Sequence, residues 1–149
     1  MQNKFELFTV TIARLNRLIR KIKTEEMSEF NLKTPHVSCL YYLYCAQSLT
    51  ATELCGLCEE DKASVSRAID YLEKRGYIYY LETSDKKRYR SPLSLTEQGK
   101  VVGKLVNEKV NMIVEVGGKT LDDDTRQAMY RGLSVISENL EAFCKKYGE

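Results

Sequence analysis

The side chains best suited to bind a polyanion fall in two short stretches of the sequence. Residues 62–70 interleave small or basic residues with apolar ones, and Arg67 lies among them. The second stretch is a basic cluster made of Lys86, Lys87, Arg88 and Arg90. Arginine pairs bidentately with guanine, and lysine, arginine and serine all bind phosphates. Both stretches could therefore contact nucleic acid; the alternative for each is a solvated charged surface.

A Cys-x-x-Cys motif at Cys55 and Cys58 could carry redox chemistry or half of a metal site. Zinc takes about four ligands. The chain has a single histidine, His36, and no second motif of this kind. Cys55 falls on the expected core face of its helix, so we expect plain buried thiols. The alternative is a thiol-based oxidant sensor that uses one or more of Cys39, Cys45, Cys55, Cys58 and Cys144.

The sequence offers no catalytic constellation. His36 directly follows Pro35 in the first turn of an expected helix, where it is an exposed or helix-capping residue. The sequence has no nucleophile beside a base, no glycine-rich phosphate loop and no carboxylate pair in a supporting context. We therefore expect no enzyme, no cofactor and no metal.

Length and composition fit one globular domain of 149 residues. Apolar residues make up 43% of the chain and charged residues 30%, which excludes a disordered chain. The net charge of +2 excludes a uniformly basic protein, so local clusters decide what the chain binds. The first ten residues lack the long apolar region of a signal peptide, so we expect none. The apolar run 39–46 is too short for a membrane span. Free cysteines then indicate a cytoplasmic protein.

Hydrophobic periodicity predicts the elements that position these residues. Apolar residues recur every three or four positions over 5–22, which predicts a helix over about 3–30. A second helix over 34–47 begins with Thr34 as its N-cap and Pro35 in its first turn. This helix is apolar nearly all round, so we expect it at the centre of the fold.

A helix-turn-helix is predicted next. Thr50 and Glu53 form a capping box that opens a short helix, which ends near Cys58. The following helix, 62–75, has one apolar stripe, and Gly76 stops it. In a helix-turn-helix the second helix lies in the DNA major groove.

A β-hairpin follows this pair of helices. Aromatic and β-branched residues predict strands over 77–83 and 89–95, with Pro92 at an edge or a bulge. The basic cluster lies at the tip. Such a ribbon can follow the DNA backbone and place one arginine in the minor groove.

Two long helices complete the chain. One opens at residues 96–99 and is broken at 117–118, and the last follows the acidic residues 122–124. The first and last helices cannot both bury their apolar stripes within one small subunit, so we expect a homodimer. The interface residues are Phe5, Phe8, Ile12, Leu15, Leu133, Ile136, Leu140 and Phe143.

The segments 53–55, 65–78 and 95–99 resemble the MarR family of bacterial transcription regulators, and the helical layout extends the resemblance over the chain. The resemblance implies a mainly α (α+β) fold, a winged helix-turn-helix with long terminal helices that form a dimerisation domain. Residues 34–99 would be the DNA-binding part, and 1–33 with 100–149 the dimerisation part.

The resemblance also implies residue roles. Ser64, Ser66 and Arg67 would lie in the major groove, Arg88 would be the wing-tip arginine, and Asp85 would orient it. The complete set of candidate DNA-binding residues is Thr50, Lys62, Ala63, Ser64, Ser66, Arg67, Asp85, Lys86, Lys87, Arg88 and Arg90.

The function expected from the resemblance is that of a dimeric, sequence-specific regulator that binds a pseudo-palindromic operator in double-stranded DNA. It would be a repressor that responds to a small-molecule effector, and Tyr41, Tyr42 and Tyr44 could line the pocket or belong to the core. The chain departs from the family at Glu59 and Glu60, which with Asp61 would repel phosphates. This acidic run favours the alternative of a winged-helix protein-interaction module without DNA binding; a thiol-based redox regulator is the other.

Overall fold

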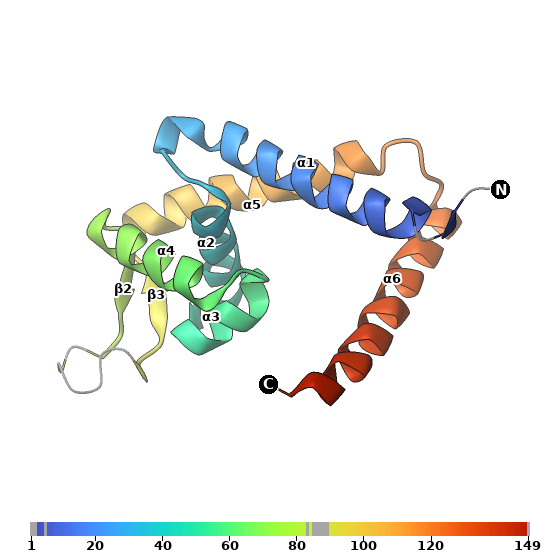
Figure 1. The fold of residues 1–149 in the computed structure, drawn as a ribbon. Helices are drawn as coiled ribbons and strands as arrows, with labels where there is room; N and C mark the ends of the chain where they lie inside the picture. The colour runs from blue at the N-terminus through green and yellow to red at the C-terminus, as the bar shows by residue number, and fades with distance from the viewer. Residues whose placement is uncertain (1–2, 5, 83, 85–89, 149) are drawn as a thin grey trace. The chain divides into compact units, whose positions relative to one another are not determined.

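The structure is a computed structural model that describes residues 3–4, 6–82, 84 and 90–148 (Figure 1). It is mainly helical with one small antiparallel sheet, as predicted. The chain divides into two compact units, Met1–Ile113 and Val114–Glu149. The first unit holds the helix-turn-helix and the sheet.

Helix α2 (Thr34–Ala46) is the centre of the first unit, as its apolar sequence predicts. It contacts α1 (Thr11–Glu26), α3 (Ala51–Cys58), α4 (Lys62–Lys74) and the sheet. Its buried side chains include Val37, Leu40 and Leu43, which join a core that also holds residues of α3, α4 and α5 (Glu97–Gly117). The helix-turn-helix is therefore built directly on the core (Figure 1).

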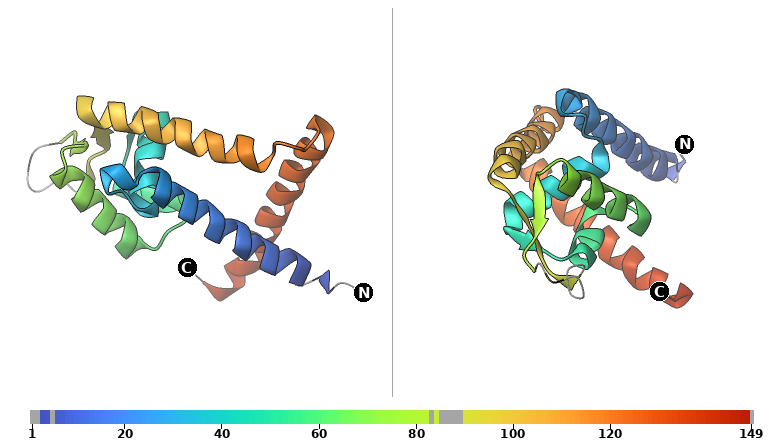
Figure 2. Two further views of the ribbon diagram at one scale, coloured as in Figure 1. Left: turned by 90° about the horizontal axis from the view of Figure 1, so that it is seen from above. Right: turned by 90° about the vertical axis from the view of Figure 1, so that its left-hand side faces the viewer.

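The sheet has three strands in the order β1-β3-β2. Strands β2 (Ile78–Tyr80) and β3 (Leu93–Leu95) pair antiparallel beside α4 (Figure 2). Both are shorter than predicted. The amide of Leu81 still donates to the carbonyl of Pro92 at 2.9 Å, but Pro92 has no amide hydrogen to continue the ladder. Strand β1 (Ser48–Leu49) was not predicted, because two residues carry no periodic signal.

The predicted first helix is three elements rather than one. A π-helical turn (Glu6–Val10) precedes α1 (Thr11–Glu26), and a short 3-10 helix (Ser28–Phe30) follows it. The break falls at Met27, whose side chain is fully buried, because the chain turns into the core there. A second correction concerns Thr34, predicted as the N-cap of α2: its hydroxyl instead donates to the carbonyl of Arg20 at 3.2 Å.

Helix α5 (Glu97–Gly117) opens against the end of α4, where two segments meet closely. The Thr96 hydroxyl donates to the carbonyl of Gly76 at 2.6 Å and accepts the amide of Gly99 at 3.0 Å. A Cβ on Gly99 would lie 1.9 Å from the carbonyl oxygen of Tyr77, so only glycine fits. Further along, Lys109 donates to Glu26 of α1 at 2.9 Å.

The second unit is formed by the end of α5 and by α6 (Asp123–Cys144), followed by a 3-10 turn (Lys145–Tyr147). Asp122 caps α6 by accepting the amide of Thr125 at 2.8 Å, and Asp123 and Asp124 form the acidic first turn. Among the residues that the structure describes, no α6 side chain is buried. None of the helices in the described residues has the length and apolar character that a membrane span requires.

Candidate nucleic-acid interface

Helix α4 presents two opposite faces, as predicted from its sequence. Its apolar face, made of Val65, Ala68, Ile69 and Leu72, is buried in the core. The opposite face exposes Lys62, Ala63, Ser66, Arg67 and Asp70, and Ser64 is half-buried beside them. The predicted contact residues of α4 therefore lie together in its N-terminal half, opposite the face that packs in the core. They are Lys62, Ala63, Ser64, Ser66 and Arg67.

A chain of hydrogen bonds orders the start of α4. One carboxylate oxygen of Asp61 accepts the amide of Ser64 at 2.8 Å, and the other accepts the Ser64 hydroxyl at 2.7 Å. The hydroxyl of Ser64 accepts from a guanidinium nitrogen of Arg67 at 3.3 Å. The bonds from the hydroxyl and amide of Ser64 hold the pKa of Asp61 below its usual range. Asp61 is thus an N-cap that also orients Arg67.

Two of the three acids before α4 form side-chain contacts within the protein. Glu59 ends α3 in a left-handed conformation with φ 52°. Glu60 forms an ion pair with Arg20 of α1, and its side chain is only 11% exposed. Asp61 caps α4. The three acids therefore shape the turn between α3 and α4, and only part of their charge faces solvent.

The C-terminal end of α4 is held by an aromatic cluster that sequence reasoning missed. Tyr71 stacks on His36 with ring centroids 4.3 Å apart, and its hydroxyl donates to the carbonyl of Asn31 at 2.9 Å. The Arg75 guanidinium lies over the rings of Tyr71 and Tyr77. These contacts join residues up to 40 positions apart, so no local pattern could reveal them.

His36 also has the helix-capping role predicted for it. Its Nδ1 accepts the amide of Lys33 at the start of α2, at 3.0 Å. Burial, with the charges of Lys33 and Arg75 as smaller causes, lowers the pKa of His36. The neutral imidazole is therefore the form that caps α2 and stacks on Tyr71.

The predicted wing is described only at its base. Asp85, Lys86, Lys87 and Arg88 lie outside the described residues, and Arg90 is exposed. The Ser91 hydroxyl accepts a hydrogen bond from the amide of Glu82 at 2.6 Å. This bond joins the segment that follows β2 to the segment that precedes β3.

Thr50, the remaining predicted contact, caps α3. Its hydroxyl accepts the amide of Glu53 at 3.2 Å, and its own amide donates to the Glu53 carboxylate at 2.7 Å, which is the predicted capping box. Beside it, α3, α4 and β2 enclose a cavity of about 460 Å³. The cavity is lined by Ala51, Thr52, Cys55, Lys62, Ser66, Ile69, Asp70 and Tyr80.

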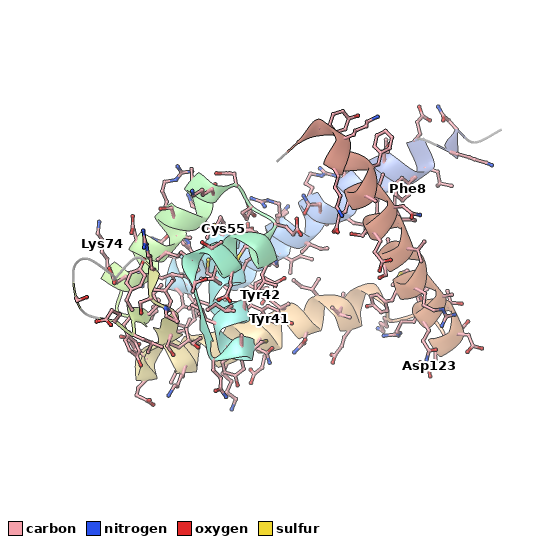
Figure 3. All side chains as sticks on the ribbon, turned by 90° about the horizontal axis from the view of Figure 1, so that it is seen from below. Phe8, Tyr41, Tyr42, Cys55, Lys74 and Asp123 are labelled. Atoms are coloured by element: carbon pink, nitrogen blue, oxygen red, sulfur yellow. The ribbon has the colours of Figure 1, made fainter. Side chains whose placement is uncertain are left out.

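Two of the three tyrosines of α2 line different cavities. Tyr41, Tyr42 and Tyr44 are half-buried and pack against the core. Tyr42 lines a small cavity near Cys58, and Tyr44 lines a different one. Figure 3 labels Tyr41 and Tyr42 on α2 and Cys55 on α3.

The two thiols of the Cys-x-x-Cys motif have different surroundings. Cys58 is buried as expected for a core thiol, but Cys55 is only half-buried and lines the cavity beside α4. The sulfur of Cys58 lies 3.8 Å from that of Cys39 in α2. Within the described chain, no three His, Cys, Asp or Glu side chains are grouped as metal ligands.

The apolar residues predicted to form a dimer interface are exposed on the single chain. Phe5 lies outside the described residues. The other members are 36–55% exposed: Phe8, Ile12 and Leu15 on or before α1, and Leu133, Ile136, Leu140 and Phe143 on α6.

The fold and the two-faced helix α4 define the class of this protein: it is a winged helix-turn-helix protein. Residues 30–88 match the sequence model of the MarR family. No curated protein matches the chain in sequence.

Solved structures of MarR regulators have the same fold. A MarR transcriptional regulator from Methanosarcina mazei Go1 superposes with a TM-score of 0.80 at 21% identity, over 96% of this chain and 94% of that one. A MarR family regulator from Neisseria meningitidis gives 0.79 at 20%, over 98% and 99%. A mutant MarR from E.coli complexed with operator DNA gives 0.70 at 19%, over 91% and 99%. The resemblance to the MarR family seen in the sequence is thereby confirmed.

Proposed function

We propose that this chain is a sequence-specific DNA-binding transcription regulator that acts as a homodimer on a pseudo-palindromic operator. The observation that carries the proposal is the exposed N-terminal face of α4, where Ser66 and Arg67 project from a helix whose other face is buried. MarR from E.coli, which shares the fold, is solved with operator DNA.

The chemistry of this face suits the major groove. Ala63 and Ser66 are small, so the helix can approach base edges closely, and Arg67 can pair with the O6 and N7 of a guanine. The Ser64 hydroxyl holds the guanidinium of Arg67 at 3.3 Å, so less side-chain freedom is lost when the base pair is contacted. Lys62 would contact a phosphate. The residues Asp85, Lys86, Lys87, Arg88 and Arg90 belong to the proposal as the wing contacts.

A homodimer is supported by the exposed apolar stripes of α1 and α6. Exposed leucine, isoleucine and phenylalanine in a regular stripe favour association, because burying them removes apolar surface from water. A two-fold dimer carries two α4 helices, which must be about one helical turn of DNA, roughly 34 Å, apart to read two half-sites.

Control by a small molecule is also part of the proposal. The cavity beside α4 is walled by Lys62 and Ser66 of the proposed DNA-binding face and by apolar side chains such as Ile69. A small ligand held there would contact the same helix that contacts DNA, so ligand and operator would compete. We expect ligand binding to release DNA, which is the behaviour of a ligand-responsive repressor.

The alternative of a protein-interaction module rested on the acidic run before α4. Because Glu60 pairs with Arg20 and Asp61 caps α4, this run has a structural role that needs no protein partner.

The experiment that tests the proposal selects genomic fragments with the purified full-length protein and measures the Kd of an enriched fragment by fluorescence anisotropy. We expect one sequence to bind far more tightly than a shuffled fragment of equal length. Equal Kd values for enriched and shuffled DNA would contradict sequence-specific binding.

A further inference from the structure

Two buried thiols face each other where α3 ends. The sulfurs of Cys39, in α2, and Cys58, the last residue of α3, are 3.8 Å apart. The two residues are 19 positions apart in the sequence, so helix packing and not a local motif brings them together. This pair has no part in the proposed DNA contacts.

The two thiols differ in access. Cys58 lines a cavity of about 210 Å³ that also takes in Lys23, Ser38 and Glu60. Cys39 is 0% exposed and lies behind it. A small molecule in this cavity therefore reaches Cys58 first.

The two thiols also differ in acidity. The hydrogen bond from the Cys39 thiol lowers the pKa of Cys58, and nearby Lys23 lowers it further, against the opposing effects of burial and of Glu60. The same hydrogen bond, followed by burial, raises the pKa of Cys39. Cys58 is thus the thiol more readily deprotonated, and the protonated Cys39 donates a hydrogen bond to the Cys58 thiolate.

We propose that Cys58 and Cys39 form an oxidation site for small hydroperoxides, which convert the pair into an intrachain disulfide. In the first step the Cys58 thiolate attacks the terminal oxygen of the hydroperoxide and the O–O bond breaks. Cys58 becomes a sulfenic acid, and the alkoxide takes a proton and leaves as an alcohol. In the second step the Cys39 sulfur attacks the Cys58 sulfur, the S–O bond breaks, and the Cys39 proton leaves in the water formed.

The disulfide would change the start of α4. The two sulfurs must approach from 3.8 Å to about 2.05 Å. Cys58 immediately precedes Glu59, Glu60 and Asp61, which end α3, pair with Arg20 and cap α4. Movement of the end of α3 therefore displaces the turn that positions α4. This consequence for DNA rests on the proposed function; the disulfide itself does not.

The other three cysteines provide the comparison. Cys45 and Cys144 are exposed, and Cys55 lines the cavity beside α4. Replacing all three (Cys45→Ser, Cys55→Ser and Cys144→Ser together) leaves only the proposed pair.

The test treats the reduced full-length protein, and this triple variant, with tert-butyl hydroperoxide and maps the cysteines by alkylation and peptide mass spectrometry. We expect a Cys39–Cys58 cross-linked peptide, the loss of two free thiols and an unchanged chain mass on a denaturing gel. Cys39→Ser should stall at a sulfenic acid on Cys58 that dimedone traps. Persistent thiols at Cys39 and Cys58, or a Cys55–Cys58 bond instead, would overturn the proposal.

DNA binding is measured separately on the same samples. We expect the disulfide to weaken operator binding by about tenfold or more and dithiothreitol to restore it. A disulfide that forms while neither form binds DNA would refute the proposed function and leave the oxidation site standing. If the protein binds DNA and the disulfide forms without changing its affinity for DNA, the coupling between the disulfide and α4 is refuted.

Discussion

Asp61, Ser64 and Arg67 show how single residues prepare the surface of α4. Two bonds from Ser64 to Asp61 start the helix, and the same serine hydroxyl holds the guanidinium of Arg67. The carboxylate that the sequence marks as a repulsive charge is therefore the group that places the arginine. Sequence reasoning identified Arg67 but could not predict this role for Asp61.

Arg67→Ala is expected to lose discrimination for the operator by about 1–3 kcal/mol, because the guanine contact disappears. The measurement is the Kd for operator and shuffled DNA by fluorescence anisotropy. Lys74→Ala, on the same helix but in its last turn (Figure 3), is the matched control and should retain specificity. Equal losses in the two variants would mean that charge, and not a base contact, is what Arg67 supplies.

The stability of the protein should depend on the ionisation of Asp61. Its pKa is lower in the folded state, so its stabilising effect is complete above the unfolded pKa and is lost as the pH falls through the folded one. We expect the free energy of unfolding to decline below about pH 4 and Asp61→Asn to reduce that decline. Urea titrations at several pH values measure it, with Asp70→Asn as control. An unchanged pH profile in Asp61→Asn would contradict the capping role.

At the scale of elements, the sequence predicts the helices better than the sheet. Hydrophobic periodicity places α2, α4 and α5 closely, because one buried stripe recurs over many residues. Strand β1 has two residues and escapes any periodic test. The break at Met27 and the partnership of Cys58 with Cys39 depend on packing between distant segments, which a single sequence does not display.

Gly99→Ala should strongly destabilise the unit Met1–Ile113, which holds the helix-turn-helix and the sheet. Its Cβ would lie 1.9 Å from the carbonyl oxygen of Tyr77, so α5 would have to move away from the end of α4. We expect a loss of about 2 kcal/mol or more, typical of steric strain in a packed region. Gly56→Ala in α3 is the control, since a Cβ there meets nothing within 4 Å and alanine favours helices. Thermal unfolding followed by circular dichroism compares them; equal Tm values would refute the close approach.

At the scale of the whole molecule, the exposed apolar stripes are the feature that a single chain leaves unexplained. Neither α1 nor α6 has a buried residue in the described chain. Their stripes were predicted from the sequence, and we propose that a second copy of the chain covers them.

Leu140→Glu should weaken or abolish a dimer, because it places a charge in an apolar contact. The measurement is the molar mass by light scattering across a range of protein concentrations. Val135→Glu is the matched control: Val135 is 56% exposed and Leu140 53%, but Val135 lies off the predicted stripe. If the wild-type chain is a monomer at all concentrations, or if both variants dissociate alike, the proposed interface is wrong.

The central claim is that two copies of α4 read a two-fold symmetric site. Footprinting of the full-length protein on the DNA upstream of its own gene, at two salt concentrations, tests this most directly. We expect a symmetric protected site whose half-site centres are about one helical turn, roughly 34 Å, apart, with protection that falls steeply at the higher salt as counterions return to the phosphates. An intact dimer that protects no DNA even at the lower salt would contradict the claim.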